Sequence, residues 1–99
     1  DQQPGFRMTY LITCVVDPRR ESARAGLRAD HLQYVGSRKS EISFGGVVEA
    51  PDGSLLRVLF FVEAATEKDA WAFAAGDPYA ALYETITVTA FQTRIPASR

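Results

Sequence analysis

The stretch SLLRVLFFVEA, residues 54–64, limits the possible folds of this chain more than any other segment. Its β-branched and aromatic residues are typical of a β-strand. Both alternating sets of side chains are apolar: Leu55, Leu59 and Phe61 in one set, and Leu56, Val58, Phe60 and Val62 in the other. Because neighbouring side chains of a strand point to opposite faces, one layer of helices would leave an apolar face uncovered. The fold must therefore cover this strand on both sides.

Three more strands and two helices follow from composition and hydrophobic periodicity. The strands are expected at residues 8–16, 41–50 and 83–95, and the helices at residues 18–38 and 67–75. Asp17 is suited to be the N-cap of the first helix, with Pro18 as its first residue. Asp52-Gly53 predicts a hairpin turn between the second and third strands. Thr66 and Asp69 resemble a capping box at the start of the second helix, and Gly76 is expected to end that helix.

The resulting order, β-α-β-β-α-β, is typical of a ferredoxin-like α+β fold, with a four-stranded antiparallel sheet and two helices on one face. The opposite face, including parts of 8–16 and 54–62, would remain apolar and exposed. A second copy of the chain would cover it. We therefore expect a homodimer whose sheets face each other, a dimeric α+β barrel.

Length and charge exclude several classes of protein. Ninety-nine residues suit one domain, expected at 8–99, and the polar residues 1–7 are expected to be a disordered extension or a cloning remnant. Eleven basic and twelve acidic residues give a net charge of −1, which argues against binding to nucleic acid or an anionic membrane. No apolar run is long enough to span a bilayer. The single cysteine, Cys14, lies in an apolar strand and agrees with a cytoplasmic location.

The only histidine, His31, lies on the apolar side of the first predicted helix, together with Ala23, Leu27, Tyr34 and Val35. Histidine is the commonest general acid or base because it titrates near neutrality. One histidine cannot build the usual multi-histidine metal site, so we expect no metal bound by the protein. Spacing alone favours a simpler interpretation, in which His31 is a core or interface residue with one ring nitrogen hydrogen-bonded.

Asp77 also has two interpretations. An aspartate before Pro78, followed by YAALY, is suited to cap a short helical turn by accepting the amide of Tyr79 or Ala80. Alternatively, its carboxylate orients the imidazole of His31, as a carboxylate does when it fixes a histidine tautomer. Spacing alone favours the cap.

Five further residues are weaker candidates for substrate contacts: Arg28, Tyr10, Ser43, Gly45 and Tyr79. An arginine one turn from the histidine can pair with a carboxylate or a phenolate. A glycine within a strand is typical of a bulge or of close approach beside a ligand. The alternatives are a solvated arginine, a simple bulge and aromatic core packing.

Taken together, residues 8–95 resemble the YCII-related family, the YciI-like proteins of the dimeric α+β barrel superfamily. The resemblance rests on the opening strand and on the segments RADHLQYV around His31, EISFGGVVEAPDGS, TEKDAWAFAAGDPY and LYETITVTAF. Family members commonly have AGP where this chain has GGV at 45–47. The shape of the pocket is therefore expected to differ here.

The resemblance implies a site and a class of chemistry. The family's helical histidine and the aspartate of its Asp-Pro-Tyr segment are regarded as an active-site pair, and they match His31 and Asp77. A relative dehydrochlorinates a chlorinated hydroxyquinol, and the superfamily includes muconolactone isomerases and monooxygenases. We therefore expect a cofactor-independent lyase, dehydrohalogenase or isomerase for small cyclic or aromatic substrates, with His31 as general acid or base. The alternatives are a non-catalytic dimeric module that binds a small ligand or partner, and a monooxygenase.

Overall fold

The computed structural model describes residues 7–96, so the extension expected at 1–7 lies almost wholly outside the described residues. The predicted β-α-β-β-α-β order is confirmed. Its elements are β1 (Met8–Val16), α1 (Arg24–Ser37), β2 (Ile42–Glu49), β3 (Leu55–Ala64), α2 (Glu67–Gly76) and β4 (Tyr83–Phe91). Three short 3₁₀ helices connect them: η1 (Glu21–Ala23), η2 (Lys39–Glu41) and η3 (Pro78–Leu82).

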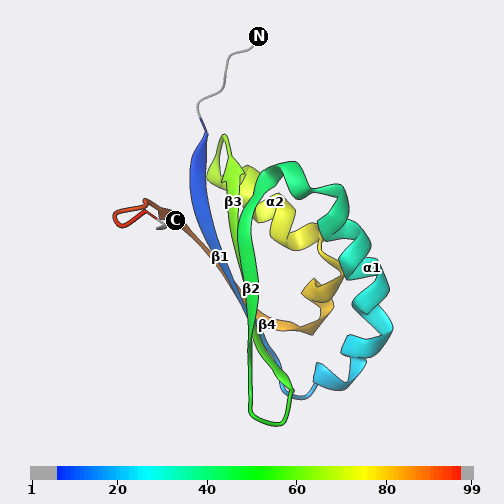
Figure 1. Cartoon of the computed structure of the whole chain (residues 1–99). Coiled ribbons are helices and arrows are strands. Elements are labelled where there is room, and N and C mark those ends of the chain that lie inside the picture. Colours follow the sequence, from blue (N-terminus) through cyan, green and yellow to red (C-terminus); the bar gives the residue numbers. More distant parts are fainter. Residues whose placement is uncertain (1–6, 97–99) are drawn as a thin grey trace.

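The four strands form one antiparallel sheet in the order β2-β3-β1-β4. Both helices lie on the same side of this sheet (Figure 1). This is the predicted ferredoxin-like arrangement, with the longest strand, β3, paired on both edges. Within residues 7–96, no helix is long and apolar enough to cross a membrane.

Element boundaries differ from the prediction mainly in the first helix and the last strand. The first helix was expected at 18–38, but α1 begins at Arg24, after a turn and η1. Asp17 Oδ1 accepts the backbone N–H of Arg19 at 2.9 Å, so Asp17 caps the turn after the strand and not α1 itself. β4 ends at Phe91, four residues earlier than expected.

The hairpin turn, the N-cap at Thr66 and the helix end at Gly76 are found where they were expected, although the Asp69 side chain makes no return hydrogen bond to Thr66 among the described residues. Gly53 has a positive φ of 89°, and its N–H donates to Ala50 O at 2.8 Å, which closes the β2–β3 hairpin. Thr66 Oγ1 accepts the N–H of Asp69 at 3.1 Å and caps α2. α2 ends at Gly76, where any Cβ would meet Tyr34 Oη at 2.6 Å. A side chain at this position would therefore force the Tyr34 ring of α1 to move.

The hydrophobic core lies between the sheet and the helices. Its buried members come from β1, β3, α2, η3 and the start of β4: Tyr10, Ile12, Cys14, Val16, Leu55, Val58, Phe60, Val62, Ala70, Phe73, Ala74, Tyr79, Leu82 and Tyr83. α1 contributes no buried residue. Of its predicted inward residues, Leu27, His31, Tyr34 and Val35 are half-buried and Ala23, which precedes it, is exposed. Thus α1 covers the sheet only in part.

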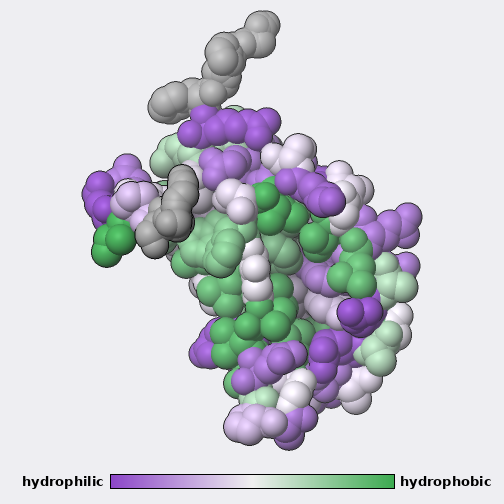
Figure 2. Space-filling model, in the orientation of Figure 1, coloured by the Kyte–Doolittle hydropathy of each residue, from purple (hydrophilic) through white to green (hydrophobic). Residues whose placement is uncertain are grey.

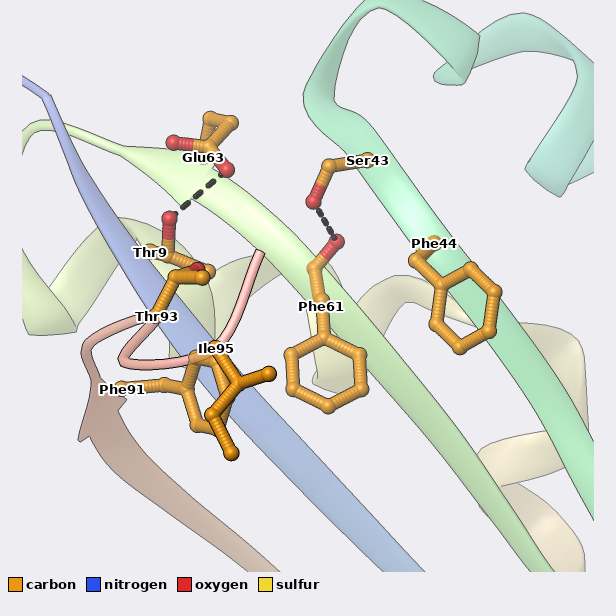
Figure 3. Close-up of a pocket in the computed structure, with 8 residues that line it drawn as sticks. All are labelled: Thr9, Ser43, Phe44, Phe61, Glu63, Phe91, Thr93 and Ile95. Atoms are coloured by element: carbon orange, nitrogen blue, oxygen red, sulfur yellow. Dashed lines mark hydrogen bonds between the residues drawn. The ribbon is translucent and has the colours of Figure 1, made fainter. Parts of the chain in front are cut away.

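The opposite face of the sheet carries an aromatic cluster made of Phe44, Phe61 and Phe91. Their ring centroids lie 5.8 Å apart for Phe44 and Phe61 and 4.8 Å apart for Phe61 and Phe91. Figure 3 shows this cluster beside a cavity of about 380 Å³ that is also lined by Thr9, Ser43, Glu63, Thr93 and Ile95. Phe44 is 69% exposed. The second apolar face predicted for this sheet is therefore present and uncovered in a single chain.

Candidate functional site

The site is formed where α1 packs against η3. His31 lies on the inward side of α1, and Asp77 lies immediately before η3. His31 Nδ1 and Asp77 Oδ1 are 2.7 Å apart, within hydrogen-bonding distance. Tyr34 Oη, one turn further along α1, donates to Phe73 O at 2.8 Å and fastens α1 to α2. The fold therefore brings together two residues that are 46 positions apart in sequence.

Asp77 is the N-cap of η3 and the partner of His31 at the same time. Its Oδ1 accepts the backbone N–H of Tyr79 at 2.9 Å as well as the contact from His31. Its Oδ2 accepts the hydroxyl of Tyr83 at 3.2 Å. The structure thus contains both contacts that the sequence suggested for Asp77: the cap on the amide of Tyr79 and the contact with the imidazole of His31. One oxygen serves both contacts, which leaves the second oxygen for Tyr83.

The plane of the imidazole is fixed by stacking. The rings of His31 and Tyr79 are nearly parallel, with centroids 3.8 Å apart and an interplanar angle of 6°. Phe60 of β3 lies on the sheet side, 6.5 Å between centroids. A ring held by one hydrogen bond and one stacking contact has little freedom to rotate, so its free nitrogen has a defined direction.

The site is buried but not sealed. Asp77 is 2% exposed, while the side chain of His31 retains 12% of its accessible surface. Burial, and then the nearby charge of Asp77, raise the pKa of the Cys14 thiol to about 12. Burial, and then the same charge, raise the pKa of Tyr83 far above its ordinary value. The Tyr83 phenol therefore stays protonated and donates its hydrogen to Asp77.

His31 opens into a cleft between α1 and the β2–β3 edge of the sheet. The cleft has a volume of about 270 Å³ and a mostly apolar lining: His31, Val35, Ile42, Gly45, Gly46, Val47, Val58 and Phe60. In Figure 2, hydrophobic side chains gather over this side of the molecule, between β2 and α1. His31 is the only titratable side chain of the lining.

This arrangement can move a proton. A carboxylate only accepts hydrogen bonds, so the ring donates to Asp77 through Nδ1–H, and in the neutral ring of that tautomer the lone pair lies on Nε2. None of the hydrogen bonds found among residues 7–96 uses Nε2 of His31. Nε2 is thus the nitrogen left for a molecule in the cleft. Within the same residues, no group of three or more His, Cys, Asp or Glu side chains is placed to hold a metal ion.

The five weaker candidates are distributed over the molecule. Gly45 lines the cleft, and Tyr79 lies behind the imidazole. Arg28 is exposed beside a surface depression near η1, Tyr10 is buried in the core, and Ser43 borders the cavity on the opposite face. Arg28, Tyr10 and Ser43 do not line the cleft, and their role in substrate binding stays an untested prediction.

Among the residues in contact with the His31–Asp77 pair, sequence reasoning missed two, Tyr83 and Phe60. The sequence places Tyr83 at the end of the YAALY turn and at the start of the last strand, and gives it no contact with Asp77, six positions earlier. Phe60 was correctly placed on an apolar face of β3, but nothing local indicated that this face looks toward His31. Both contacts depend on tertiary structure, and neither has a local sequence signal.

Comparison with known proteins agrees with the fold. A family model described as the YCII-related domain matches residues 8–92. A comparison with curated proteins finds no significant match. Among solved structures, the chain is similar to 5-chloro-2-hydroxyhydroquinone dehydrochlorinase from Burkholderia phenoliruptrix AC1100, in complex with 2,5-dihydroxybenzoquinone. That match has a TM-score of 0.77 and 24% identity, and covers 86% of this chain and 94% of that chain.

A more distant similarity is to a "putative antibiotic biosynthesis monooxygenase" from Bacteroides thetaiotaomicron. It has a TM-score of 0.54 and 12% identity, and covers 94% of each chain. At these identities, both structural matches show a shared fold.

Proposed function

The chain belongs to the YCII-related family, and on that premise we propose that it is an enzyme that transfers protons on a small cyclic or aromatic substrate without a cofactor. The observation that carries the proposal is the 2.7 Å contact between His31 and Asp77 at the wall of an apolar cleft. Carboxylate-supported histidine is a common general base, and the geometry meets the hydrogen-bonding distance that this role requires.

In this mechanism, Nε2 of His31 takes a proton from a ring hydroxyl or from an acidified C–H of the substrate. Asp77 stabilises the imidazolium that forms, and Tyr79 keeps the ring in place. The imidazolium returns its proton at another ring atom in an isomerisation. In a dehydrohalogenation, the halide leaves with the bonding electron pair. The imidazolium then releases its proton to solvent, so that the substrate overall loses one proton and one halide ion, and no external oxidant or reductant takes part.

The cleft favours a flat apolar substrate. Its volume of about 270 Å³ suits one small ring, and its lining is aliphatic and aromatic apart from His31. The similar dehydrochlorinase is named for a chlorinated hydroxyhydroquinone. A positioned acid or base contributes about 10²–10⁴-fold to a rate, so the substrate must already carry an acidic O–H or C–H. Chlorinated hydroquinols meet that condition.

Chloride release from 5-chloro-2-hydroxyhydroquinone tests this proposal. We expect release by the protein above the spontaneous rate, with a loss of about 10²–10⁴-fold in His31→Gln. Gln33→Ala is the matched control, because Gln33 is exposed on the same helix. Release that is the same in His31→Gln and in the control would exclude His31 as the base.

Two other functions would give different experimental results. A non-catalytic binding module would bind 2,5-dihydroxybenzoquinone, seen as chemical-shift changes around the cleft, and would release no halide from any tested ring. A monooxygenase would consume oxygen in the presence of a quinol, which an oxygen electrode detects.

We also propose that the aromatic cluster Phe44, Phe61 and Phe91 lies in a homodimer interface between two sheets. Phe44 and Phe91 are exposed in one chain and Phe61 is half-buried, and small chains gain buried surface by pairing. Sedimentation at micromolar concentration should give a dimer, and Phe44→Glu should shift it toward the monomer. A compact monomer in the unmodified protein would exclude this interface.

A further inference from the structure

Behind the His31–Asp77 pair lies a third polar side chain that sequence reasoning did not find. Tyr83 opens β4 and is 6% exposed, and its hydroxyl donates to Asp77 Oδ2 at 3.2 Å. The hydroxyl therefore contacts the one carboxylate oxygen that neither His31 nor the backbone of Tyr79 uses. We propose that Tyr83 is a positioning residue that sets how strongly Asp77 accepts the proton of His31. The proposal rests on the proposed function of the His31–Asp77 pair.

Within the described residues, Tyr83 is the only group that contacts Oδ2 of Asp77. Among the hydrogen bonds of residues 7–96, Asp77 is contacted only by His31, Tyr79 and Tyr83, and no lysine or arginine pairs with it. Tyr83 and Cys14 stay protonated in this buried region because burial, together with the Asp77 charge, disfavours their anions. Tyr83 is thus a permanent donor to Oδ2 and draws negative charge away from Oδ1.

The effect of removing the Tyr83 hydroxyl on the His31–Asp77 hydrogen bond follows from how the charge is shared between the two oxygens of Asp77. Without the Tyr83 hydroxyl, Oδ2 is left buried without its donor, and more of the charge is held at Oδ1. The hydrogen bond from Nδ1 of His31 then becomes stronger, because a less stabilised carboxylate is a stronger acceptor. The orientation of Asp77 is kept, since the backbone N–H of Tyr79 still holds Oδ1 at 2.9 Å.

Tyr83→Phe tests this inference, read through the Nδ1–H proton of His31 by NMR. The signal is unambiguous because the chain has one histidine. We expect the Nδ1–H resonance to move downfield in Tyr83→Phe. Tyr34→Phe is the matched control: it removes the hydroxyl of a second, half-buried tyrosine, which donates to the carbonyl of Phe73 at 2.8 Å and not to Asp77. A purely structural role predicts equal and small changes in both variants and would overturn the inference.

A second measurement covers the case in which Tyr83→Phe does not fold. In the unmodified protein, the Tyr83 hydroxyl proton should be observable because it is buried and bonded to a carboxylate. Asp77→Asn replaces that carboxylate by a neutral amide, so the hydroxyl resonance should move upfield. An unchanged resonance would show that Tyr83 does not sense Asp77.

These results are separable from the proposed function. If the Nδ1–H signal responds to Tyr83→Phe while no substrate is turned over, the coupling stands and the enzymatic proposal fails. If turnover depends on His31 and Asp77 while Tyr83→Phe changes neither turnover nor the Nδ1–H signal, only the role of Tyr83 fails.

Discussion

The two buried aspartates of this chain have the same local structure and opposite surroundings. Asp17 and Asp77 each precede a proline, each is 2% exposed, and each accepts with Oδ1 the backbone N–H two residues later at 2.9 Å. Each therefore fills the same capping role at the end of a strand or helix. The Asp-Pro pair and the capping hydrogen bond alone would not tell the two positions apart.

The difference lies in what meets the remaining lone pairs. The carboxylate of Asp17 accepts from Nε of Arg19 at 3.1 Å and from Nη2 at 2.9 Å, and Arg20 lies 3.4 Å from it. Its charge is neutralised by two arginines at the surface. Asp77 faces the neutral hydroxyl of Tyr83 and the imidazole of His31. Its charge is available to a histidine, and this makes Asp77 the candidate catalytic residue and Asp17 a structural one.

The largest expected difference between the two aspartates is in turnover. Asp77→Asn keeps an oxygen at the Oδ1 position for Tyr79 N–H and for Nδ1–H, but removes the charge that stabilises the imidazolium. We expect proton-transfer activity to fall by about 10²–10⁴-fold, and Asp17→Asn to leave it unchanged. Steady-state chloride release measures both. Equal losses in the two variants would remove the distinction between them.

Removing the whole carboxylate of Asp77 should have a large effect on stability. Asp77→Ala leaves three donors without a partner: the N–H of Tyr79, the Tyr83 hydroxyl and Nδ1–H of His31. Lost caps and buried unsatisfied donors predict a decrease of about 2–4 kcal/mol in the free energy of unfolding. Asp77→Asn should cost less than about 1 kcal/mol, because its oxygen still accepts the two N–H groups and its NH2 group can donate to the Tyr83 oxygen after the hydroxyl turns. Urea denaturation measures both, and equal losses would contradict the proposed contacts.

High pH should lower the free energy of unfolding through the buried thiol of Cys14. The folded chain holds the pKa of Cys14 at about 12, mainly through burial, against an ordinary value of 9.0. The thiol therefore contributes fully to stability below pH 9.0, and this contribution is lost as the pH rises toward 12, because the unfolded chain releases the proton first. Cys14→Ala should lose less stability between these pH values. An equal loss of stability in Cys14→Ala and in the unmodified protein would show that Cys14 is not the group responsible.

Low pH should act on Asp17, with a smaller effect. Hydrogen bonds from the side chain and then the backbone of Arg19 lower the pKa of Asp17 from 3.8 to about 2. Its contribution is present above pH 3.8 and is lost as the pH falls toward 2, since the unfolded chain then binds the proton more readily. Denaturation curves at several acidic pH values should show a shallower loss for Asp17→Asn. A slope equal to that of the unmodified protein would contradict this account.

Much of the fold was predictable because its signals are local or periodic. The two-sided β3, the hairpin at Gly53 and the cap at Thr66 each follow from a few neighbouring residues, and the structure has them where they were expected. The start of α1 was not predictable in the same way. Asp17 and Pro18 are suitable for a helix start, but the arginines at 19 and 20 bind the Asp17 carboxylate and hold a turn there.

The candidate site was predictable only as two separate residues. The lone histidine on an apolar helical face and the aspartate of the Asp-Pro-Tyr segment were both found, each with a structural interpretation that spacing favoured. Their contact, the stacking of Tyr79 and the donor Tyr83 all cross between elements that are distant in sequence. Residue patterns carry no information on such distances, so the pairing rested on the family resemblance until the structure placed the atoms.

The tautomer of His31 tests the central claim most directly, that Asp77 orients this ring toward the cleft. Nitrogen NMR of the neutral ring distinguishes a protonated Nδ1 from a protonated Nε2 and needs no substrate. We predict hydrogen on Nδ1 and a bare Nε2 in the unmodified protein and in Asp17→Asn, and a loss of this preference in Asp77→Ala. Hydrogen on Nε2 in the unmodified protein, or the same tautomer balance in Asp77→Ala, would contradict the account.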